Sequence, residues 1–243
     1  MINLIVAVEN DIDILDQFLR WYKLLGVERF IVNVINNNNF PIYDEIKNKC
    51  DKYNSVVIDR GRADHDFKIQ HKFRTLAQKQ YSSKDDWTFF ADLDEFYDLE
   101  SINQIVNRAE AHKCNTICGT FVDRFCKNNN KFNKFDPRES IFDQYPIESD
   151  FSKKILKVPQ RRYVAVKGWI LEGSICPRFQ DGQYLNIIEG CSIHEEIVKI
   201  NHFKWRKGVV EKMKKRLNKY ENSEEHKYSY RQCKRFLEYI NRL

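Results

Sequence analysis

The sequence predicts an α/β protein with a mostly parallel, twisted sheet that helices cover on both sides. Short apolar segments rich in β-branched and aromatic residues alternate with segments whose apolar residues recur every three or four positions. Strands that alternate with helices are typical of parallel sheets. The chain has 243 residues, 42% of them hydrophobic and 14% aromatic, which is enough for one sizeable packed core.

The first half of the chain carries the clearest pattern. A buried strand is predicted at Ile2–Val8, and a helix at residues 12–25 follows it, with Asn10 and Asp11 as N-cap candidates and Gly26 as the C-terminal stop. Further strands are predicted at residues 29–35, 55–59, 87–91 and 116–121, and further helices at residues 44–53, 66–81 and 102–112.

The second half is less regular. Residues 127–134 predict a loop, and residues 141–157 show no clear period. Strands are predicted at residues 162–171 and 184–188, as antiparallel additions at one edge of the sheet, and terminal helices at residues 209–220 and 232–243. Because no linker or internal repeat divides the chain, we expect a single domain.

Composition limits the class of protein. The first apolar run is too short to span a membrane and lacks the basic start and cleavage site of a signal peptide, so we expect a soluble, cytoplasmic protein without a transmembrane segment. The seven cysteines are scattered and form no CxxC pair. Neither a disulfide framework nor a thiolate zinc site is therefore indicated.

The positive charge is concentrated in the last part of the chain. Residues 199–243 hold 14 Lys or Arg and 5 Asp or Glu, although the whole chain carries a net charge of only +6. Such a tail can meet a nucleotide diphosphate, an anionic membrane surface through peripheral contact, or nucleic acid. A solvated helix face explains most of these lysines equally well.

An acidic motif follows the predicted strand at residues 87–91. Alternate residues of an extended segment point the same way, so the carboxylates of Asp92 and Asp94 can converge on one divalent cation while Leu93 turns into the core. The three carboxylates of Asp92, Asp94 and Glu95 follow the strand closely, and they repel one another unless a cation or a basic partner lies among them. The carboxyl ends of the strands are also where open α/β sheets bind ligands. We therefore predict a site in which a divalent metal binds phosphate, with a simple acidic turn as the alternative.

Other phosphate and metal motifs are missing from the sequence. The chain has no GxGxxG after its first strand and no GxxxxGK[ST]. An EF-hand is excluded because Tyr97 stands where the loop needs glycine. A metal bound to Asp94 could instead bridge two phosphates and neutralise charge as a nucleoside diphosphate leaves. Such a site would indicate glycosyl transfer from a sugar nucleotide.

Three segments resemble a known family. Residues 9–30 look like the opening of GT-A glycosyltransferases of the family 2-like and family 92-like kind, Asp92-Leu93-Asp94-Glu95-Phe96 is similar to the family's DxD metal motif, and residues 200–204 are similar to its late His-aromatic segment. The resemblance covers residues 3–99 and 198–216. It departs from the family at Asp16-Gln17-Phe18-Leu19-Arg20, where a Glu often precedes Trp21, and at Lys23, where His is common.

This resemblance implies a GT-A (Rossmann-like) fold in one domain, with residues 1–99 as the nucleotide-sugar-binding half and residues 100–243 as the acceptor-binding half with basic C-terminal helices. It implies metal-dependent transfer from a nucleoside-diphosphate sugar, a UDP-sugar by expectation, to a glycan or glycoprotein acceptor. Asp94 would bind Mn²⁺ or Mg²⁺ directly. Asp92 would share the metal or accept hydrogen bonds from the ribose, and His202 would be the remaining metal ligand.

Topology and charge suggest further binding residues. Val8, Glu9 and Asn10 end the first strand and are placed to line the nucleobase, with the loop at residues 59–66 as another candidate wall. His202 is a lone histidine, and a lone histidine is more often a structural residue than a metal ligand.

The basic residues that follow His202 in the sequence favour a role in ligand binding over a purely structural role. A diphosphate needs cationic partners. Lys204 is therefore a candidate for binding the nucleotide, with Arg206 and Lys207 close behind it in the sequence.

Candidates for catalysis are fewer. Asp123 follows the strand predicted at residues 116–121 and is the first candidate for the base of an inverting transfer, with an ion pair to Arg124 or another basic side chain as the structural alternative. Glu172, Asp181 and His194 are weaker acceptor-side candidates. Glu95 can equally be an acceptor for backbone N–H groups, and Asp98 is expected at the surface.

Two rival functions come from other classes. A haloacid-dehalogenase-like phosphatase also uses Asp-x-Asp after an apolar strand, but that motif usually opens its domain and continues with small residues. A basic nucleic-acid-binding module could use Lys212–Lys219 and the tail aromatics. Neither rival accounts for Asp94-Glu95-Phe96 after a fourth strand, and we expect no nucleic-acid partner.

Overall fold

The structure is a computed structural model. It describes residues 1–9, 12–35, 42–62, 67–127, 132–158, 161–168 and 191–242. The chain divides into two compact units. The first unit comprises Met1–Thr120 and Arg161–Ile200, and the second comprises Phe121–Gln160 and Asn201–Leu243. Each unit is therefore built from two separate stretches of sequence. The predicted division into halves at residue 99 does not coincide with these boundaries, and the single domain stays a prediction.

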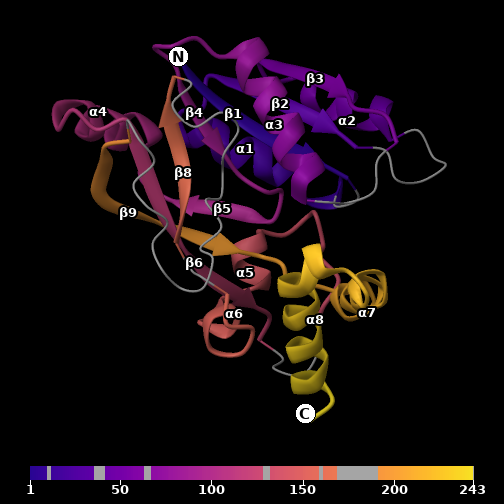
Figure 1. The fold of residues 1–243 in the computed structure, drawn as a ribbon. Coiled ribbons are helices and arrows are strands. Elements are labelled where there is room, and N and C mark those ends of the chain that lie inside the picture. Colours follow the sequence, from indigo (N-terminus) through magenta and orange to yellow (C-terminus); the bar gives the residue numbers. More distant parts are fainter. Residues whose placement is uncertain are drawn as a thin grey trace. The chain divides into compact units, whose positions relative to one another are not determined.

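Four parallel strands form one part of the sheet in the first unit. They are β1 (Ile2–Val8), β2 (Arg29–Val34), β3 (Ser55–Asp59) and β4 (Trp87–Phe90), in the order β3-β2-β1-β4. They lie side by side in indigo and purple in Figure 1. Every residue of β4 is buried, as in strands covered on both faces. The parallel arrangement places the carboxyl ends of β1 and β4 at the same edge of the sheet, with Phe90 at the end of β4 opposite Ile5 of β1.

Helices connect these strands. A 3₁₀ turn (Ile12–Ile14) leads into α1 (Leu15–Leu25), and α2 (Tyr43–Cys50) follows β2. The predicted stop at Gly26 is confirmed, because its φ of 106° is left-handed and its N–H bonds to the end of α1. The next helices along the chain are α3 (Phe67–Tyr81), which contacts β1 and β2, and α4 (Ile102–Ala111).

The other strands extend the sheet beyond β4. They are β5 (Glu95–Asp98), β6 (Thr116–Phe125), β8 (Arg161–Lys167) and β9 (Ile193–His202), in the order β4-β8-β6-β9-β5. β8 is antiparallel to both β4 and β6. It therefore lies inside the sheet, whereas the sequence predicts an antiparallel addition at an edge. Five of its seven residues are buried, which fits an interior strand.

A cluster of buried apolar residues holds the sheet of the first unit to α3. It combines Ile5, Ile31, Phe90 and Val166 from the strands with Ala77 from α3. All five side chains are fully buried. Because each large apolar side chain contributes roughly 1.5–3 kcal/mol when it leaves water, this cluster fixes the strand ends that carry the acidic motif.

In its described residues, the second unit combines the last residues of β6 and β9 with the short strand β7 and several helices. β7 (Ile147–Ser149) pairs with Asp123–Phe125 of β6 in antiparallel fashion. The helices are α5 (Ile141–Gln144), α6 (Phe151–Lys154), α7 (Val209–Tyr220), a 3₁₀ turn (Glu224–His226) and α8 (Lys227–Ile240). Its core is aromatic: Trp205 stacks on Phe125 and on Phe236, and Phe151 meets Trp205 edge-on.

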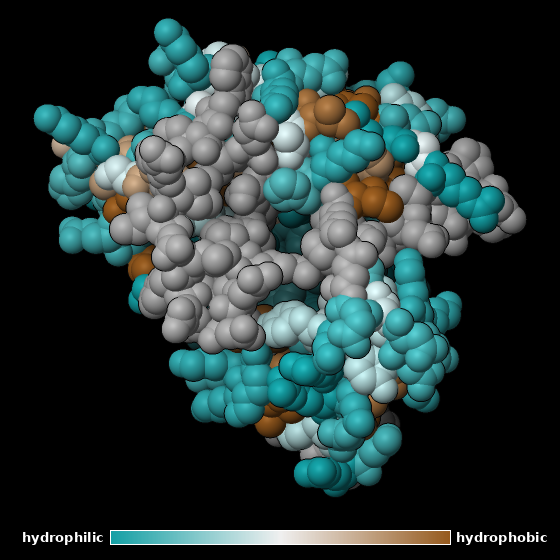
Figure 2. All heavy atoms as spheres, in the orientation of Figure 1, coloured by the Kyte–Doolittle hydropathy of each residue, from teal (hydrophilic) through white to brown (hydrophobic). Residues whose placement is uncertain are grey.

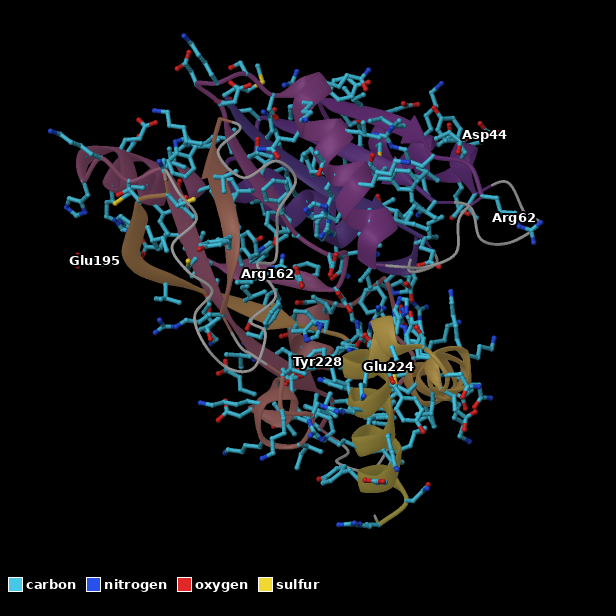
Figure 3. All side chains as sticks on the ribbon, viewed as in Figure 1. Asp44, Arg62, Arg162, Glu195, Glu224 and Tyr228 are labelled. Carbon is cyan, nitrogen blue, oxygen red and sulfur yellow. The ribbon has the colours of Figure 1, made fainter. Side chains whose placement is uncertain are left out.

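The C-terminal helices turn charged faces to the solvent. Figure 2 shows mainly hydrophilic residues over α7 and α8. In Figure 3, Glu224 and Tyr228 mark the 3₁₀ turn and the first turn of α8. The predicted bounds of α7 are confirmed, whereas α8 starts five residues earlier than predicted, at Lys227.

The α/β class is confirmed, with a mostly parallel sheet, flanking helices and antiparallel additions. Three strands, β5, β7 and β9, were not predicted, and the strand predicted at residues 184–188 lies outside the described residues. Six of the cysteines fall in described parts of the chain, and all six are free thiols. Within those same parts, no helix combines the length and apolar character that a membrane crossing requires.

Candidate active site

The acidic motif forms a tight turn at the carboxyl end of β4. The Ala91 N–H donates to the Ile5 carbonyl of β1 at 3.4 Å, and the Glu95 N–H donates back to the Asp92 carbonyl at 3.0 Å. Leu93 is buried, as predicted, while Asp92 and Asp94 are partly exposed. The turn thus places Leu93 in the core and leaves the carboxylates of Asp92 and Asp94 accessible at the sheet edge where β1 also ends.

Asp92 has a basic partner that the sequence did not identify. The guanidinium of Arg74, on α3, forms an ion pair with Asp92 Oδ1. The Arg74 side chain is only 6% exposed, whereas the Asp92 side chain is 41% exposed. A buried cation therefore offsets the charge of one of the three neighbouring carboxylates.

Glu95 has a second arginine as its partner. Arg162 of β8, labelled in Figure 3, places Nη1 2.7 Å from Glu95 Oε1 and Nη2 2.6 Å from Oε2. The Glu95 and Arg162 side chains are 3% and 4% exposed. This paired geometry is the strong form of a carboxylate–guanidinium contact. Glu95 is therefore a structural acceptor, one of the two roles that the sequence left open.

The same pair holds the backbone of the turn. The Asp92 N–H donates to Glu95 Oε2 at 2.8 Å, and Arg162 Nη2 donates to the Phe90 carbonyl at 2.8 Å. The Tyr97 hydroxyl also donates to the Phe90 carbonyl. These bonds satisfy backbone groups that β4 leaves unpaired where it ends, so they hold the backbone that carries Asp92 and Asp94 in place.

Aromatic residues of α1 support the turn from the other side. Tyr22 donates its hydroxyl to the Glu95 carbonyl at 2.9 Å, and Trp21 Nε1 donates to the Tyr97 carbonyl at 3.0 Å. Burial raises the pKa of Tyr22 and of Tyr97, so both hydroxyls stay protonated as donors. Helix α1, which was predicted from its apolar spacing, thus also stabilises the position of β5.

The other residues predicted at the nucleotide end fall in different surroundings. Val8 is fully buried and Glu9 is partly exposed, while Asn10 lies outside the described residues. After β3, Arg60 donates from Nε to Asn33 Oδ1 at 2.7 Å and lies 5.4 Å from the ring centroid of Phe73. Arg60 belongs to the loop at residues 59–66 that the sequence predicts as a candidate wall, and residues 63–66 of that loop lie outside the described residues.

Asp123 is at the centre of a buried cluster in the second unit. It has no exposed surface. Its Oδ2 accepts from the Ser152 N–H at 2.6 Å, and its Oδ1 accepts from the Ser152 hydroxyl at 2.8 Å and from Trp205 Nε1 at 2.7 Å. His202 Nδ1 lies 3.2 Å from the same Oδ1.

The charge of Asp123 is stabilised inside this cluster. Burial alone would raise the pKa of Asp123, but the hydrogen bonds from His202, Ser152 and Trp205 lower it below its ordinary value of 3.8. The predicted alternative was a pair with Arg124 or another basic side chain. Arg124 pairs instead with Glu148 at 2.8 Å, and the basic side chain beside Asp123 is His202. Asp123 also lies within β6, which runs four residues beyond its predicted end.

His202, at the end of β9, is partly buried with its side chain 15% exposed. The ring of Phe121 lies 5.2 Å from the His202 ring, centroid to centroid. Lys204 extends over the ring of Trp205 at 5.3 Å. Arg206 is buried and donates to the Phe203 carbonyl at 2.8 Å, so the predicted basic group behind His202 includes one cation with a structural role.

The weaker candidates are structural or not described. His194 is buried, stacks on His112 at 5.4 Å and accepts from the Glu196 N–H through Nδ1. Asp98 is exposed, as expected, and pairs with Lys199 at 3.3 Å. Glu172 and Asp181 lie outside the described residues.

No protein-family model matches the chain, and no curated protein matches it. Among solved structures, the crystal structure of S. aureus TarS 1–349 aligns at a TM-score of 0.47 and 13% identity, over 97% of this chain and 70% of TarS 1–349. Its complex with UDP-GlcNAc aligns at 0.48 and 14%, over 99% and 72%. HddC from Yersinia pseudotuberculosis aligns at 0.48 and 8%, over 87% and 97%. These values establish neither family nor activity.

Proposed function

We propose that this protein is a metal-dependent glycosyltransferase that moves a sugar from a nucleoside-diphosphate sugar, a UDP-sugar first, to a glycan or glycoprotein acceptor. The observation that carries the proposal is the Asp92-Leu93-Asp94 turn at the carboxyl end of β4, beside the end of β1. Ligands of open α/β sheets bind at this end of the strands. The resemblance of this motif to the DxD motif of GT-A glycosyltransferases gives the reaction class.

The acidic turn fits a hard divalent cation. Carboxylate oxygens are the ligands that Mn²⁺ and Mg²⁺ prefer. Asp94 lies in the turn with its side chain partly exposed, and the ion pair of Asp92 with Arg74 favours Asp94 as the direct ligand. When bound, the metal would neutralise the charge that develops as the nucleoside diphosphate leaves.

Asp92 has two roles compatible with its surroundings. It can share the metal, or it can accept hydrogen bonds from the ribose hydroxyls of the donor. Its contact with Arg74 fixes the position of one carboxylate oxygen, which suits recognition of a neutral hydroxyl pair. By the family resemblance, His202 would supply the remaining protein ligand of the metal.

The residues at the end of β1 would form the base of the nucleotide site. Val8 has a fully buried side chain, so it would shape the site from the core, whereas Glu9 is partly exposed and can contact the nucleotide. Asn10 keeps its predicted role beside them. Lys204 would supply a cation for the diphosphate.

The predicted role of Asp123 as catalytic base does not enter this proposal. A base must reach the acceptor hydroxyl to take its proton, but the carboxylate of Asp123 is buried and already accepts from donors on both oxygens. The phosphatase alternative is less favoured because its nucleophile would be Asp92, and one carboxylate oxygen of Asp92 is paired with Arg74.

Calorimetric titration tests the proposal. UDP, with GDP as the control nucleotide, is titrated into the protein with and without Mn²⁺. We expect UDP to bind only with metal, and we expect Asp94→Asn to weaken this binding by at least about tenfold, which corresponds to about 1.4 kcal/mol. His202→Ala would also weaken it.

Asp98→Asn is the matched control for Asp94→Asn. Asp98 is an exposed carboxylate four residues away that pairs with Lys199, and no role in the site is assigned to it. Its substitution should leave the UDP affinity unchanged. Equal binding of UDP with and without Mn²⁺, or equal losses in the two variants, would contradict the proposal.

A further inference from the structure

The Asp123 cluster surrounds the one buried carboxylate in the described residues of the second unit, and the proposed chemistry gives that carboxylate no role. Its members come from three elements: Asp123 from β6, Ser152 from α6 and His202 from the end of β9, with Trp205 just beyond. A buried carboxylate is costly unless hydrogen bonds compensate for the loss of water. Four groups surround this one.

Two of these groups can only donate. The indole Nε1 of Trp205 donates to Oδ1 and the backbone N–H of Ser152 donates to Oδ2, and neither nitrogen can accept a hydrogen bond. A proton on either oxygen of Asp123 would compete with one of these donors. The arrangement therefore suits a carboxylate, which accepts only.

The tautomer of His202 follows from this accounting. A carboxylate has no hydrogen to offer, so the contact of 3.2 Å between Oδ1 and Nδ1 is a hydrogen bond only if Nδ1 carries the proton. In the neutral ring, the lone pair is then on Nε2. A nitrogen with a lone pair is what a metal ligand requires.

We infer that Asp123 is the positioning residue of His202: it holds the imidazole ring in one orientation and one tautomer, with the proton on Nδ1 and the lone pair on Nε2. The inference rests on the proposed function where it concerns metal binding by His202. The tautomer itself can be measured whether or not the protein binds metal.

Neighbouring side chains make this positioning precise. The ring of Phe121 packs against the His202 ring. Trp205, which shares Oδ1 with His202, is fully buried between aromatic residues and cannot move away from Asp123 without disrupting that core. Such outer partners of a metal-bound histidine typically change metal affinity by about 10- to 100-fold when they are removed.

Nuclear magnetic resonance tests the inference directly. In protein labelled with ¹⁵N-histidine, long-range ¹H–¹⁵N correlations at about pH 8.5, well above the ordinary histidine pKa of about 6.5, report which ring nitrogen carries the proton. The His202 signals are assigned by their loss in His202→Gln. We expect the Nδ1–H tautomer in the wild-type protein, and an Nε2–H tautomer there would overturn the inference.

Two variants separate positioning from a purely structural role. Asp123→Ala removes the acceptor and should abolish the preference for Nδ1–H, with Asp123→Leu, which also lacks an acceptor, taking its place if the alanine variant does not fold. Ser152→Ala removes one donor to Asp123 but leaves the contact with His202, so the tautomer should be unchanged. A tautomer unaffected by loss of the Asp123 carboxylate would contradict the inference.

Mn²⁺ titrations of the same proteins distinguish the inference from the proposed function. We expect Asp123→Asn to lower the Mn²⁺ affinity by about 10- to 100-fold and Ser152→Ala to leave it unchanged. If wild-type protein shows the Nδ1–H tautomer but binds no Mn²⁺, the proposed metal site fails and the positioning of His202 stands. If wild-type protein binds Mn²⁺ and Asp123→Asn binds it equally well, the positioning role fails.

Discussion

Arg162 and Glu95 form a buried ion pair in which each guanidinium Nη atom contacts one carboxylate oxygen, at 2.7 and 2.6 Å. The pair joins β8 to the first residue of β5, directly beneath the acidic turn. Because Glu95 also accepts from the Asp92 N–H and Arg162 also donates to the Phe90 carbonyl, the pair fixes the backbone on both sides of that turn.

Glu95→Gln should strongly destabilise the fold. The substitution leaves the charge of Arg162 buried without its counter-ion, a change that typically costs about 3–5 kcal/mol. Urea unfolding measures the free energy of unfolding. Glu196→Gln is the matched control, because Glu196 makes an exposed pair with Arg108 at 2.8 Å. That variant should lose no more than about 1 kcal/mol, and similar losses in the two variants would contradict the assigned role of Glu95.

Arg74→Met should weaken nucleotide binding with little change in folding. Methionine keeps most of the side-chain volume, but Asp92 loses the cation that balances and orients it. We expect the affinity for UDP with Mn²⁺ to fall by roughly tenfold, or about 1.4 kcal/mol, in calorimetric titrations. Arg108→Met removes an exposed guanidinium of the same kind and should leave binding unchanged. Unaltered or tighter binding in Arg74→Met would show that Asp92 needs no such partner.

Gly168→Ala should destabilise the protein more than Gly61→Ala. Both glycines have left-handed backbone, with φ of 66° and 69°, so the conformational cost of about 1–2 kcal/mol is shared. A Cβ on Gly168 would lie 2.6 Å from the backbone carbonyl oxygen of Lys84, whereas a Cβ on Gly61 would meet nothing within 4 Å. Overpacking adds about 1–3 kcal/mol. Urea unfolding of the two variants should reveal this difference, and equal stabilities would refute it.

The sequence predicted best the elements whose pattern is local. The predicted bounds of β1 and β3 are those of the structure, because turn residues and polar segments flank each apolar run. The bounds of α7 are also as predicted, since its buried residues recur at helical spacing. β5, β7 and β9 were missed because each contains charged residues, and their strand structure depends on pairing with other strands.

The candidate site was predicted only in part for the same reason. The Asp92-Leu93-Asp94 motif is local, so the sequence could place it at a strand end and turn Leu93 inward. The partners of the motif are not local: Arg162 is 67 residues from Glu95, and Arg74 is 18 residues from Asp92. Nothing in the composition distinguishes these two arginines from the remainder of the 41 Lys and Arg residues.

Because β6 and β9 each run from the first unit into the second, the core of the second unit is assembled from two segments with residues 161–200 of the first unit between them. During synthesis, Asp123 leaves the ribosome 79 residues before His202 and 82 residues before Trp205. Its carboxylate must therefore stay hydrated until those donors arrive, and a nascent chain that stops before residue 201 cannot complete this pocket. The acidic turn, Arg74 and Arg162 are all synthesised before that point, so their pairing can precede it.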